Sequence, residues 1–274
     1  MKLFVIKIGG NIIDDEKQLS WFLNDFSSIS ENKMLVHGGG KIATELSKQL
    51  GIEPKMVEGR RITDADTLKI VQMVYGGLIN KNIVAQLQAR NCNAIGLSGA
   101  DGNIVLAHKR APVDLTPNPS PTGEGRKNKV DYGFVGDIEK VNSEKLSALF
   151  TSGFSPIIAP LTHDGKGQML NTNADTMASA ISVAMSQQFD TTLIYCFEKS
   201  GVLRNMDDEN SVIEKINLKE YEKLKTEGVI SKGMIPKLDN AFDAIKQGVK
   251  SVVICHAKEL NKLIKGQDSG TRLV

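Results

Sequence analysis

The sequence has few cysteines, few aromatic residues and no long hydrophobic run. Its 274 residues include three cysteines and one tryptophan, and aromatic residues make up 5%. Cys92, Cys196 and Cys255 lie far apart and are odd in number, which favours buried free thiols in a reducing compartment over a disulfide framework. The four histidines are isolated, so no paired-ligand spacing indicates a zinc site.

Neither sign of charge dominates the chain. Thirty-four basic and 32 acidic residues give a net charge of +2, which makes nucleic acid a poor candidate partner. No apolar segment reaches the ~18 residues of a membrane span. The first ten residues, MKLFVIKIGG, have too short an apolar stretch for a signal peptide and no small-residue cleavage site. We therefore expect a cytoplasmic protein with no membrane partner.

Short apolar runs alternate with longer amphipathic segments. We expect buried strands at 3–8, 34–38, 93–98, 155–160, 191–197 and 251–256. We expect helices, with apolar residues recurring every three or four positions, at 15–29, 41–50, 64–89, 143–152, 174–187, 217–227 and 237–247. This alternation predicts an α/β fold with a mostly parallel sheet covered by helices on both faces. Ligands of such sheets bind at the carboxyl ends of the strands.

Two segments interrupt this alternation. Residues 102–109 and 130–141 predict shorter, hairpin-like strands laid over the main sheet. Between them, residues 110–129 carry four of the eight prolines and predict a mobile surface loop, which we interpret as a tolerated insertion rather than a substrate lid. We place a boundary between two lobes near 188–190.

Three of the predicted strands end in glycine. Gly9 and Gly10 follow the first, Gly38 to Gly40 follow the second, and the segment GLSGADG follows the third. Glycine lets backbone N–H groups approach a bound anion, and a helix N-terminus behind the loop adds positive potential. The loops match neither the dinucleotide fingerprint nor the Walker A motif, because GGGKI has Ile42 where a magnesium-binding hydroxyl is needed. We expect an anionic ligand of another kind.

Two lysines and three polar residues complete the candidate site. Lys7 lies inside an apolar strand, so it either faces an anion or lies on a solvated edge strand. Lys237 lies at an expected helix start, either pointing into a cleft or at the surface. Asp175 can accept hydrogen bonds from both ammonium groups and hold them beside one phosphate. Asn171 and Asn173 precede the same helix as Asp175; capping needs one polar group, and the surplus indicates a ligand.

Eight motifs in order along the chain resemble the acetylglutamate kinases of the amino acid kinase family. They run from Lys2 to Arg272 and are VIKIGG, VHGGGK, EGRRIT, GFVGD, MLNTNAD, SGVL, GMIPK and GTR. The resemblance implies an open αβα sandwich with a mostly parallel central sheet. It also implies an acyl-amino-acid-binding lobe at 1–188 and a nucleotide-binding lobe at 189–274.

The resemblance also implies an activity and its residues. The enzyme would transfer the γ-phosphoryl group of ATP to the side-chain carboxylate of N-acetyl-L-glutamate in arginine biosynthesis, with Mg²⁺ bound through the phosphates. The implied catalytic residues are Lys7, Lys237 and Asp175. The implied acyl-glutamate ligands are Gly39, Gly40, Arg61, Asn171 and Asn173. The implied nucleotide contacts are Gly9, Gly10, Glu198, Lys199, Ser200, Gly201, Val202, Leu203, Val229, Ile230 and Ser231.

The chain departs from its relatives at three places. Glu198 and Lys199 stand where relatives usually carry Asp and Val, and Ala100 stands where many have lysine. The sequence begins at the first strand, without the helix that ties arginine-inhibited relatives into hexamers. We therefore expect a homodimer that is insensitive to arginine.

Three other functions remain open at this point. A succinylglutamate kinase would need one more basic partner near the acyl end, for which Arg60, Lys109, Arg110 and residues 126–129 are candidates. A non-catalytic nucleotide sensor on the same fold is disfavoured, because both lysines and the aspartate are present. A dehydrogenase is disfavoured because the dinucleotide fingerprint is absent.

Overall fold

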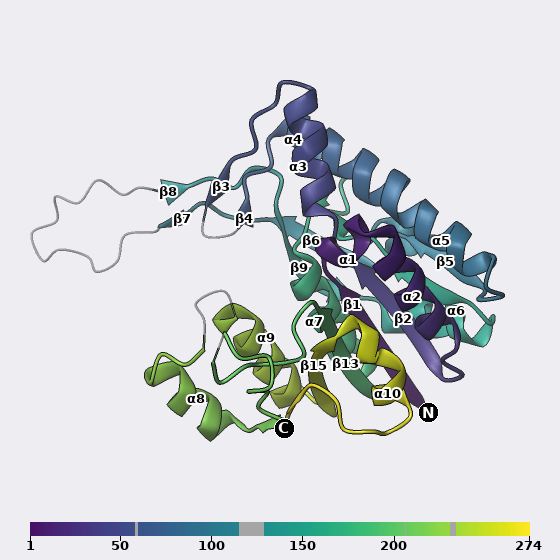
Figure 1. Ribbon diagram of the computed structural model, residues 1–274. Coiled ribbons are helices and arrows are strands. Elements are labelled where there is room, and N and C mark those ends of the chain that lie inside the picture. Colours follow the sequence, from purple (N-terminus) through teal and green to yellow (C-terminus); the bar gives the residue numbers. More distant parts are fainter. Residues whose placement is uncertain (58–59, 115–128, 206, 231–233) are drawn as a thin grey trace, which may run out of the picture.

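The computed structural model describes residues 1–57, 60–114, 129–205, 207–230 and 234–274 (Figure 1). At its centre lies an eight-stranded sheet in the order β14-β16-β15-β13-β1-β2-β10-β5. The strands are β1 Lys2–Ile8, β2 Asn32–His37, β5 Ala94–Leu97, β10 Ser155–Ile158, β13 Asp190–Phe197, β14 Lys215–Ile216, β15 Ser251–His256 and β16 Thr271–Leu273. Every pairing is parallel except that of β15 with β16. The predicted fold class is thus confirmed.

Helices cover both faces of this sheet. One face packs against α1 Gly10–Asp14, α2 Glu16–Ser27, α3 Gly40–Gln49, α4 Ala65–Val71, η1 Gln72–Ile79, α5 Asn80–Gln88 and α10 Leu260–Ile264. The other packs against α6 Ser143–Thr151, α7 Ala174–Met185, α8 Leu218–Thr226 and α9 Ile235–Lys246. Both layers are visible in Figure 1.

Strand β1 shows how sequence alternation sorts side chains between the two layers. Ile6 and Ile8 point into the layer that contains α2, whereas Leu3 and Val5 point into the layer that contains α7. Successive side chains of a strand point to opposite faces. Lys7 therefore continues the Leu3–Val5 row, and its side chain reaches the α7 side at the carboxyl end of the strand. Lys7 is in a central strand and buried, so the edge-strand alternative is wrong.

The predicted helices are present, and short polar residues start several of them. Asp15 caps α2, Asp64 caps α4, and Asn173 caps α7, each accepting hydrogen bonds from the first-turn backbone. The helix expected at 64–89 is formed by α4, η1 and α5 in succession, with a π-helical middle. Helices α1 and α10 were not predicted, because five residues are too few to show a period.

A smaller four-stranded sheet lies over the carboxyl end of the main sheet. Its order is β12-β11-β6-β9, from β6 Val105–Lys109, β9 Gly136–Val141, β11 Leu161–His163 and β12 Met169–Asn171. The predicted hairpin-like strands are β6 and β9, which pair antiparallel. Short ribbons are formed by β3 Met56–Val57 with β4 Arg60–Arg61, and by β7 Val113–Asp114 with β8 Lys129–Val130. Most of the loop expected at 110–129, residues 115–128, lies outside the described residues.

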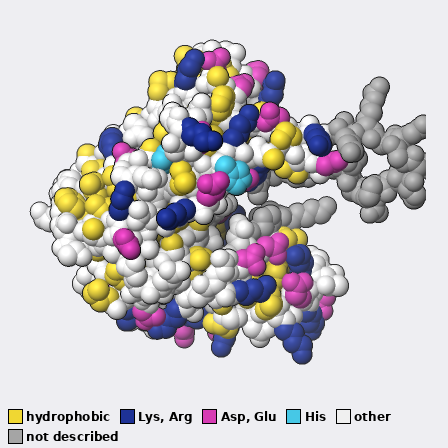
Figure 2. All heavy atoms as spheres, turned by 180° about the vertical axis from the view of Figure 1, so that it is seen from behind, with side chains coloured by type: hydrophobic (Ala, Val, Ile, Leu, Met, Phe, Trp, Pro, Cys, Tyr) yellow, Lys and Arg dark blue, Asp and Glu magenta, His cyan; other side chains and the backbone are white. Residues whose placement is uncertain are grey.

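The lobe boundary expected near 188–190 falls between α7 and β13. The main sheet continues across it, since β13 pairs with β1 along seven residue pairs in register. Within the described ranges, none of the helices is both long and apolar enough to cross a membrane. Basic and acidic side chains are interspersed over the face shown in Figure 2.

Candidate active site

Two cavities lie at the carboxyl end of the central strands. The first has a volume of about 210 Å³ and is lined by Gly39, Gly40, Arg61, Tyr75, Arg110, Asn171 and Asn173, among others; we call it the acyl pocket after the ligand that the sequence predicts for these residues. The second, the phosphate cavity, has a volume of about 410 Å³ and is lined by Lys7, Gly9, Gly10, Phe197, Lys199 and Lys237, among others. They lie close together, because the Gly38 N–H at the acyl pocket donates to the carbonyl of Ile8, the residue before Gly9.

A buried histidine fixes the glycine loop of the acyl pocket. His37 is fully buried, and its Nδ1 lies 2.9 Å from the Gly38 carbonyl oxygen. Asn80 Nδ2 donates to the Ile157 carbonyl, which orients the amide, and lies 3.1 Å from His37 Nε2. His37 Nε2 must therefore accept from Asn80, and Nδ1 must carry the hydrogen and donate to Gly38. Burial lowers the pKa of His37 to about 4, so the ring is neutral at physiological pH.

This arrangement aims a backbone donor at the pocket. A trans peptide places the N–H of a residue opposite the preceding carbonyl. Because the Gly38 carbonyl points inward at His37, the Gly39 N–H points the other way, toward the cavity. Gly39 has a φ of +147°, and a Cβ there would lie 2.2 Å from Ile79 Cδ1, so only glycine fits.

Arg61 offers an unpaired cationic donor in the acyl pocket. Its Nη2 donates to the Gly40 carbonyl at 2.9 Å and to Thr44 Oγ1 at 2.6 Å. Its Nη1 is buried and has no hydrogen-bond partner among the residues that the structure describes. A buried unpaired donor of a charged group is costly, and a planar guanidinium suits a carboxylate. The arrangement can therefore accept a ligand carboxylate without moving Arg61.

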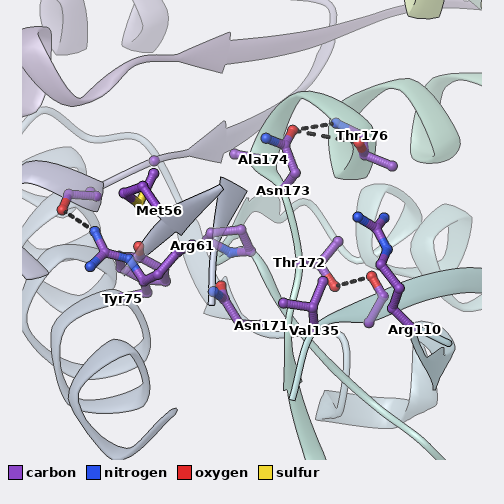
Figure 3. A pocket seen from close by; sticks show the side chains of 15 residues that line it. Met56, Arg61, Tyr75, Arg110, Val135, Asn171, Thr172, Asn173, Ala174 and Thr176 are labelled. Atoms are coloured by element: carbon purple, nitrogen blue, oxygen red, sulfur yellow. Dashed lines mark hydrogen bonds between the residues drawn. The ribbon is translucent and has the colours of Figure 1, made fainter. Parts of the chain in front are cut away.

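The two asparagines that motivated the ligand hypothesis have different neighbours. Asn173 Oδ1 accepts from the backbone N–H groups of Asp175 and Thr176, so this residue caps α7 (Figure 3). Asn171 Nδ2 donates to Thr63 Oγ1 at 3.0 Å. Both line the acyl pocket, but capping accounts for the Asn173 oxygen.

The structure brings Lys7 and Asp175 together. Lys7 Nζ lies 2.6 Å from Asp175 Oδ1, and both side chains are mostly buried, with 8% and 14% exposed. The contact is an ion pair that compensates the Lys7 charge; within the described part of the chain, Asp175 Oδ1 accepts no hydrogen bond of normal geometry. A buried pair of this kind costs several kcal/mol to break by removing one partner, about 3–5.

Lys237 lines the phosphate cavity together with Lys7, but its contacts differ from those that the sequence predicts. No carboxylate of the described residues lies within ion-pair distance of its Nζ, so the expectation that Asp175 bonds to both lysines is wrong in this structure. Its Nζ lies 3.9 Å from the centroid of the Phe197 ring. Burial lowers the pKa of Lys237, Asp175 and Glu198 oppose that shift, and Lys7 adds to it. Asp175 thus acts on Lys237 through space only.

The segment expected to contact the nucleotide is divided between cavity and core. Glu198, Lys199 and Gly201 line the phosphate cavity with Gly9 and Gly10. Ser200 instead lines a separate cavity near β16.

The remaining expected nucleotide contacts are less accessible. The side chains of Val202, Leu203 and Ile230 are buried in the core, and Val229 packs against it. The Val202 N–H already donates to Thr271 Oγ1 at 2.8 Å. Ser231 lies outside the described residues.

Sequence reasoning missed two residues and left one undecided. Tyr75 borders the acyl pocket on η1, and burial raises the pKa of its hydroxyl. Phe197 contacts the Lys237 ammonium, whose Nζ lies over its ring. Arg110 was one of several candidates, and it lies on the side of the acyl pocket opposite Arg61 (Figure 3). The pairing of strands and the path of β6 decide these placements, and neither is visible in residue spacing.

Arg110 lines the acyl pocket and is held by the carboxylate of Asp137. Its Nε donates to Asp137 at 3.0 Å, and Nη2 also contacts Asp137. Its guanidinium lies over the Tyr132 ring at 5.6 Å. Lys109 instead pairs with Asp131. The side chain of Arg60 and residues 126–128 lie outside the described part of the chain.

No metal-binding cluster is found in the described ranges, where no three of His, Cys, Asp or Glu gather. The three cysteines are buried free thiols, with Cys196 and Cys255 on adjacent strands.

Comparison with known proteins assigns the chain to a family. The amino acid kinase family model matches residues 2–256. The acetylglutamate kinase of Cytophaga hutchinsonii is 60% identical over 274 residues, covering 100% of this chain and 98% of that protein. The acetylglutamate kinase of Bacteroides fragilis is 55% identical over 272 residues, covering 99% and 97%.

A solved structure supports the fold assignment. The N-acetylglutamate synthase of Neisseria gonorrhoeae, complexed with coenzyme A and N-acetyl-glutamate, superimposes with a TM-score of 0.78 at 20% identity, over 100% of this chain and 59% of that one. At that identity the likeness concerns the fold alone. Sequence match, fold and the residues gathered at the two cavities agree: this chain belongs to the amino acid kinase family, within its acetylglutamate kinase branch.

Proposed function

We propose that the protein transfers the γ-phosphoryl group of ATP to the side-chain carboxylate of N-acetyl-L-glutamate, the reaction named for its relatives. One observation carries the proposal: a pocket with a buried arginine nitrogen that no described residue pairs adjoins a cavity with two lysines. A carboxylate ligand on one side and a polyphosphate on the other match these charges. The product is an acyl phosphate, an intermediate of arginine biosynthesis.

The acyl pocket binds the amino acid. Arg61 Nη1 donates to the α-carboxylate, which satisfies this buried donor. The Gly39 and Gly40 amides and the amide nitrogens of Asn171 and Asn173 hold the remaining oxygens. The side-chain carboxylate then points toward the glycine loop that separates the two cavities.

The phosphate cavity binds ATP as its Mg²⁺ complex. The ion would be held through the phosphates and would compensate part of their negative charge. Gly9 and Gly10 present backbone N–H groups to the phosphates, and the segment Glu198 to Gly201 contacts the nucleotide. We place the reaction in the cytoplasm, where ATP is available and the thiols stay reduced.

The chemistry needs alignment and charge compensation but no general base. A carboxylate is already an anionic nucleophile at neutral pH. Lys7 and Lys237 face the phosphoryl group as negative charge spreads over its oxygens in the transition state. Asp175 holds Lys7 Nζ at 2.6 Å. The Lys7 ammonium therefore stays beside the phosphoryl group and does not pair with the substrate carboxylate.

An ADP-release assay with acetyl-, succinyl- and free glutamate tests the proposal. We expect turnover with N-acetylglutamate, little with free glutamate, and loss of turnover in Lys237→Met. ATP binding without turnover on any of the three would overturn the proposal and indicate a nucleotide sensor. Failure to bind ATP would contradict both.

Arg110 favours a second candidate, a succinylglutamate kinase. A succinyl group adds one carboxylate at the acyl end, and Arg110 lies across the pocket from Arg61. The ratio of kcat/KM for the two acyl-glutamates decides between the candidates. If succinyl is the substrate, Arg110→Met should lower kcat/KM for succinylglutamate at least tenfold more than for acetylglutamate. An equal change for both would reject it.

We also propose a homodimer. Met73 and Leu78 on η1 are 54% and 51% exposed, on the helical run α4–η1–α5 beside the edge strand β5. Two exposed large apolar side chains on one run suit burial against a second copy. Light scattering tests this; a monomer at all concentrations would contradict it.

A further inference from the structure

Two ammonium groups share one aromatic ring in the phosphate cavity. Lys237 Nζ lies 3.9 Å from the centroid of the Phe197 ring, and Lys7 Nζ lies 5.2 Å from it. Both distances are within the range of cation–π attraction, and the ring faces both cations. Phe197 is half-buried and lines the cavity itself.

The two lysines differ in how their charge is compensated. Lys7 has the Asp175 carboxylate at 2.6 Å. Among the described residues, Lys237 has no ion-pair partner, and it is held beside a like charge in a partly buried place. Desolvation and the nearby Lys7 both favour loss of its proton or movement away from the cavity. The Asp175 and Glu198 charges oppose both through space, and the ring face opposes them by direct contact.

The ring is itself held in one position. Phe197 ends β13, and Tyr195 lies two residues earlier on the same face, with the two rings 6.1 Å apart and inclined by 14°. Tyr195 is fully buried, and its hydroxyl donates to the backbone carbonyl of Asp175 at 3.3 Å. Tyr195 is also the residue paired in register with Lys7. The aromatic pair thus ties the position of the Lys237 ammonium to the strand and helix that carry Lys7 and Asp175.

We infer that Phe197 is a positioning residue for phosphoryl transfer: its ring holds the Lys237 ammonium, protonated, beside Lys7 until the phosphates arrive. The expected effect on catalysis rests on the proposed function. The claim that the ring holds the ammonium does not. Phosphate oxygens attract an ammonium more strongly than a ring does, so Lys237 can leave the ring for the transferring group. A carboxylate in place of the ring would hold Lys237 back.

The test compares Phe197→Leu, which keeps an apolar side chain but removes the ring face, with Phe197→Tyr, which keeps the face. The groups around Lys237 are Asp175 on α7, Lys7 on β1 and Glu198 after β13, and none is changed. Phe189→Leu is the matched control, since this buried phenylalanine lies just before the other end of β13 and packs edge-on against Phe150.

We expect Phe197→Leu to lower kcat about tenfold with little change in KM for the acyl-glutamate. The alkaline limb of kcat should move to lower pH by up to about one unit, because the ammonium loses the ring's stabilisation. Phe197→Tyr should restore both, and Phe189→Leu should change neither. Wild-type kcat and pH limb in Phe197→Leu would overturn the inference.

A second measurement does not depend on turnover. The pH dependence of Lys237 labelling by an amine-reactive reagent, followed by mass spectrometry, reports its pKa in each folded variant. A lower pKa in Phe197→Leu than in wild type and in Phe197→Tyr supports the inference even if no acyl-glutamate is phosphorylated. An unchanged pKa overturns it even if the kinase reaction is established.

Discussion

The two cavities that meet at the glycine loops are built by different interactions. In the acyl pocket, directional hydrogen bonds hold the lining residues in place. Arg61 donates to Gly40 and Thr44, and His37 donates to Gly38. In the phosphate cavity, which is about 410 Å³ against about 210 Å³, charge–charge and charge–ring contacts hold the cations: Lys7 pairs with Asp175, and Lys237 lies over the Phe197 ring. Hydrogen bonds lose strength quickly with misalignment, whereas charge–ring and charge–charge attraction varies gradually with position.

This difference fits what each cavity must do in the proposed reaction. A pocket that distinguishes one acyl-amino acid from another gains from being fixed beforehand, because little entropy is lost on binding. A cavity in which a phosphoryl group moves gains from one cation that can follow it, as Lys237 can, beside one that is fixed, as Lys7 is by Asp175. The contrast predicts that substitutions in the acyl pocket act on substrate binding, and those in the phosphate cavity on the chemical step.

The largest effect is expected for Lys237→Met. The variant removes an ammonium that acts mainly on the transition state, so kcat should fall by about 10²–10³ while both KM values change by a few-fold at most. Steady-state kinetics measures this. Lys225→Met is the matched control, because Lys225 also lies over an aromatic ring, that of Tyr221, at 5.1 Å. A large rise in KM for the acyl-glutamate with unchanged kcat would break the contrast.

A smaller effect is expected for His37→Asn on the pH dependence of stability. The pKa of His37 is lowered to about 4 in the folded protein, so the unfolded chain binds a proton first as pH falls below about 6.5. Stability from neutral His37 is therefore complete above pH 6.5 and is lost between there and pH 4, by about 3 kcal/mol in total. Asparagine can still donate to Gly38 but cannot take up the proton.

Urea unfolding from pH 7.5 to pH 4 checks this prediction. Other groups titrate equally in both proteins, so the difference between the two curves isolates His37. We expect the wild type to lose more stability than His37→Asn on acidification. Parallel curves would show that the histidine does not stiffen the glycine loop through its neutral form.

The sequence was sufficient for the fold class and for the polar residues at strand ends. Glycines after strands and a lysine in an apolar strand are local features, and the sheet brings Lys7 within 2.6 Å of Asp175. The cap at Asn173 also follows from local spacing, although the sequence could not show that capping uses its oxygen.

Contacts that depend on strand order could not be predicted. Phe197 faces Lys237 because β13 lies beside β1 and α9 crosses that face, and no spacing in the sequence encodes this. Arg110 reaches the acyl pocket because β6 pairs with β9, which carries Asp137. His37 reads as the end of a strand, and its role depends on Asn80, 43 residues away.

Arg61→Lys tests the contrast between the two cavities at the acyl pocket. Lysine supplies a point charge in place of a planar fork, so it cannot donate to Gly40 and Thr44 while also binding a carboxylate. We expect KM for the acyl-glutamate to rise roughly tenfold, with kcat and KM for ATP nearly unchanged. If KM for the acyl-glutamate stays the same, Arg61 does not bind the substrate carboxylate.

The smallest effect is expected for Lys199→Val, although Lys199 lines the phosphate cavity. Its Nζ lies 2.9 Å from Glu209, and the two side chains are 45% and 70% exposed. An exposed pair contributes little and is screened by salt, so KM for ATP should change by less than about threefold, and less again at high ionic strength. Glu209→Gln removes the partner alone and should have no larger effect. If Lys199→Val raised KM for ATP tenfold or more, the phosphate cavity would depend on fixed contacts as strictly as the acyl pocket does, and the contrast between the two would fail.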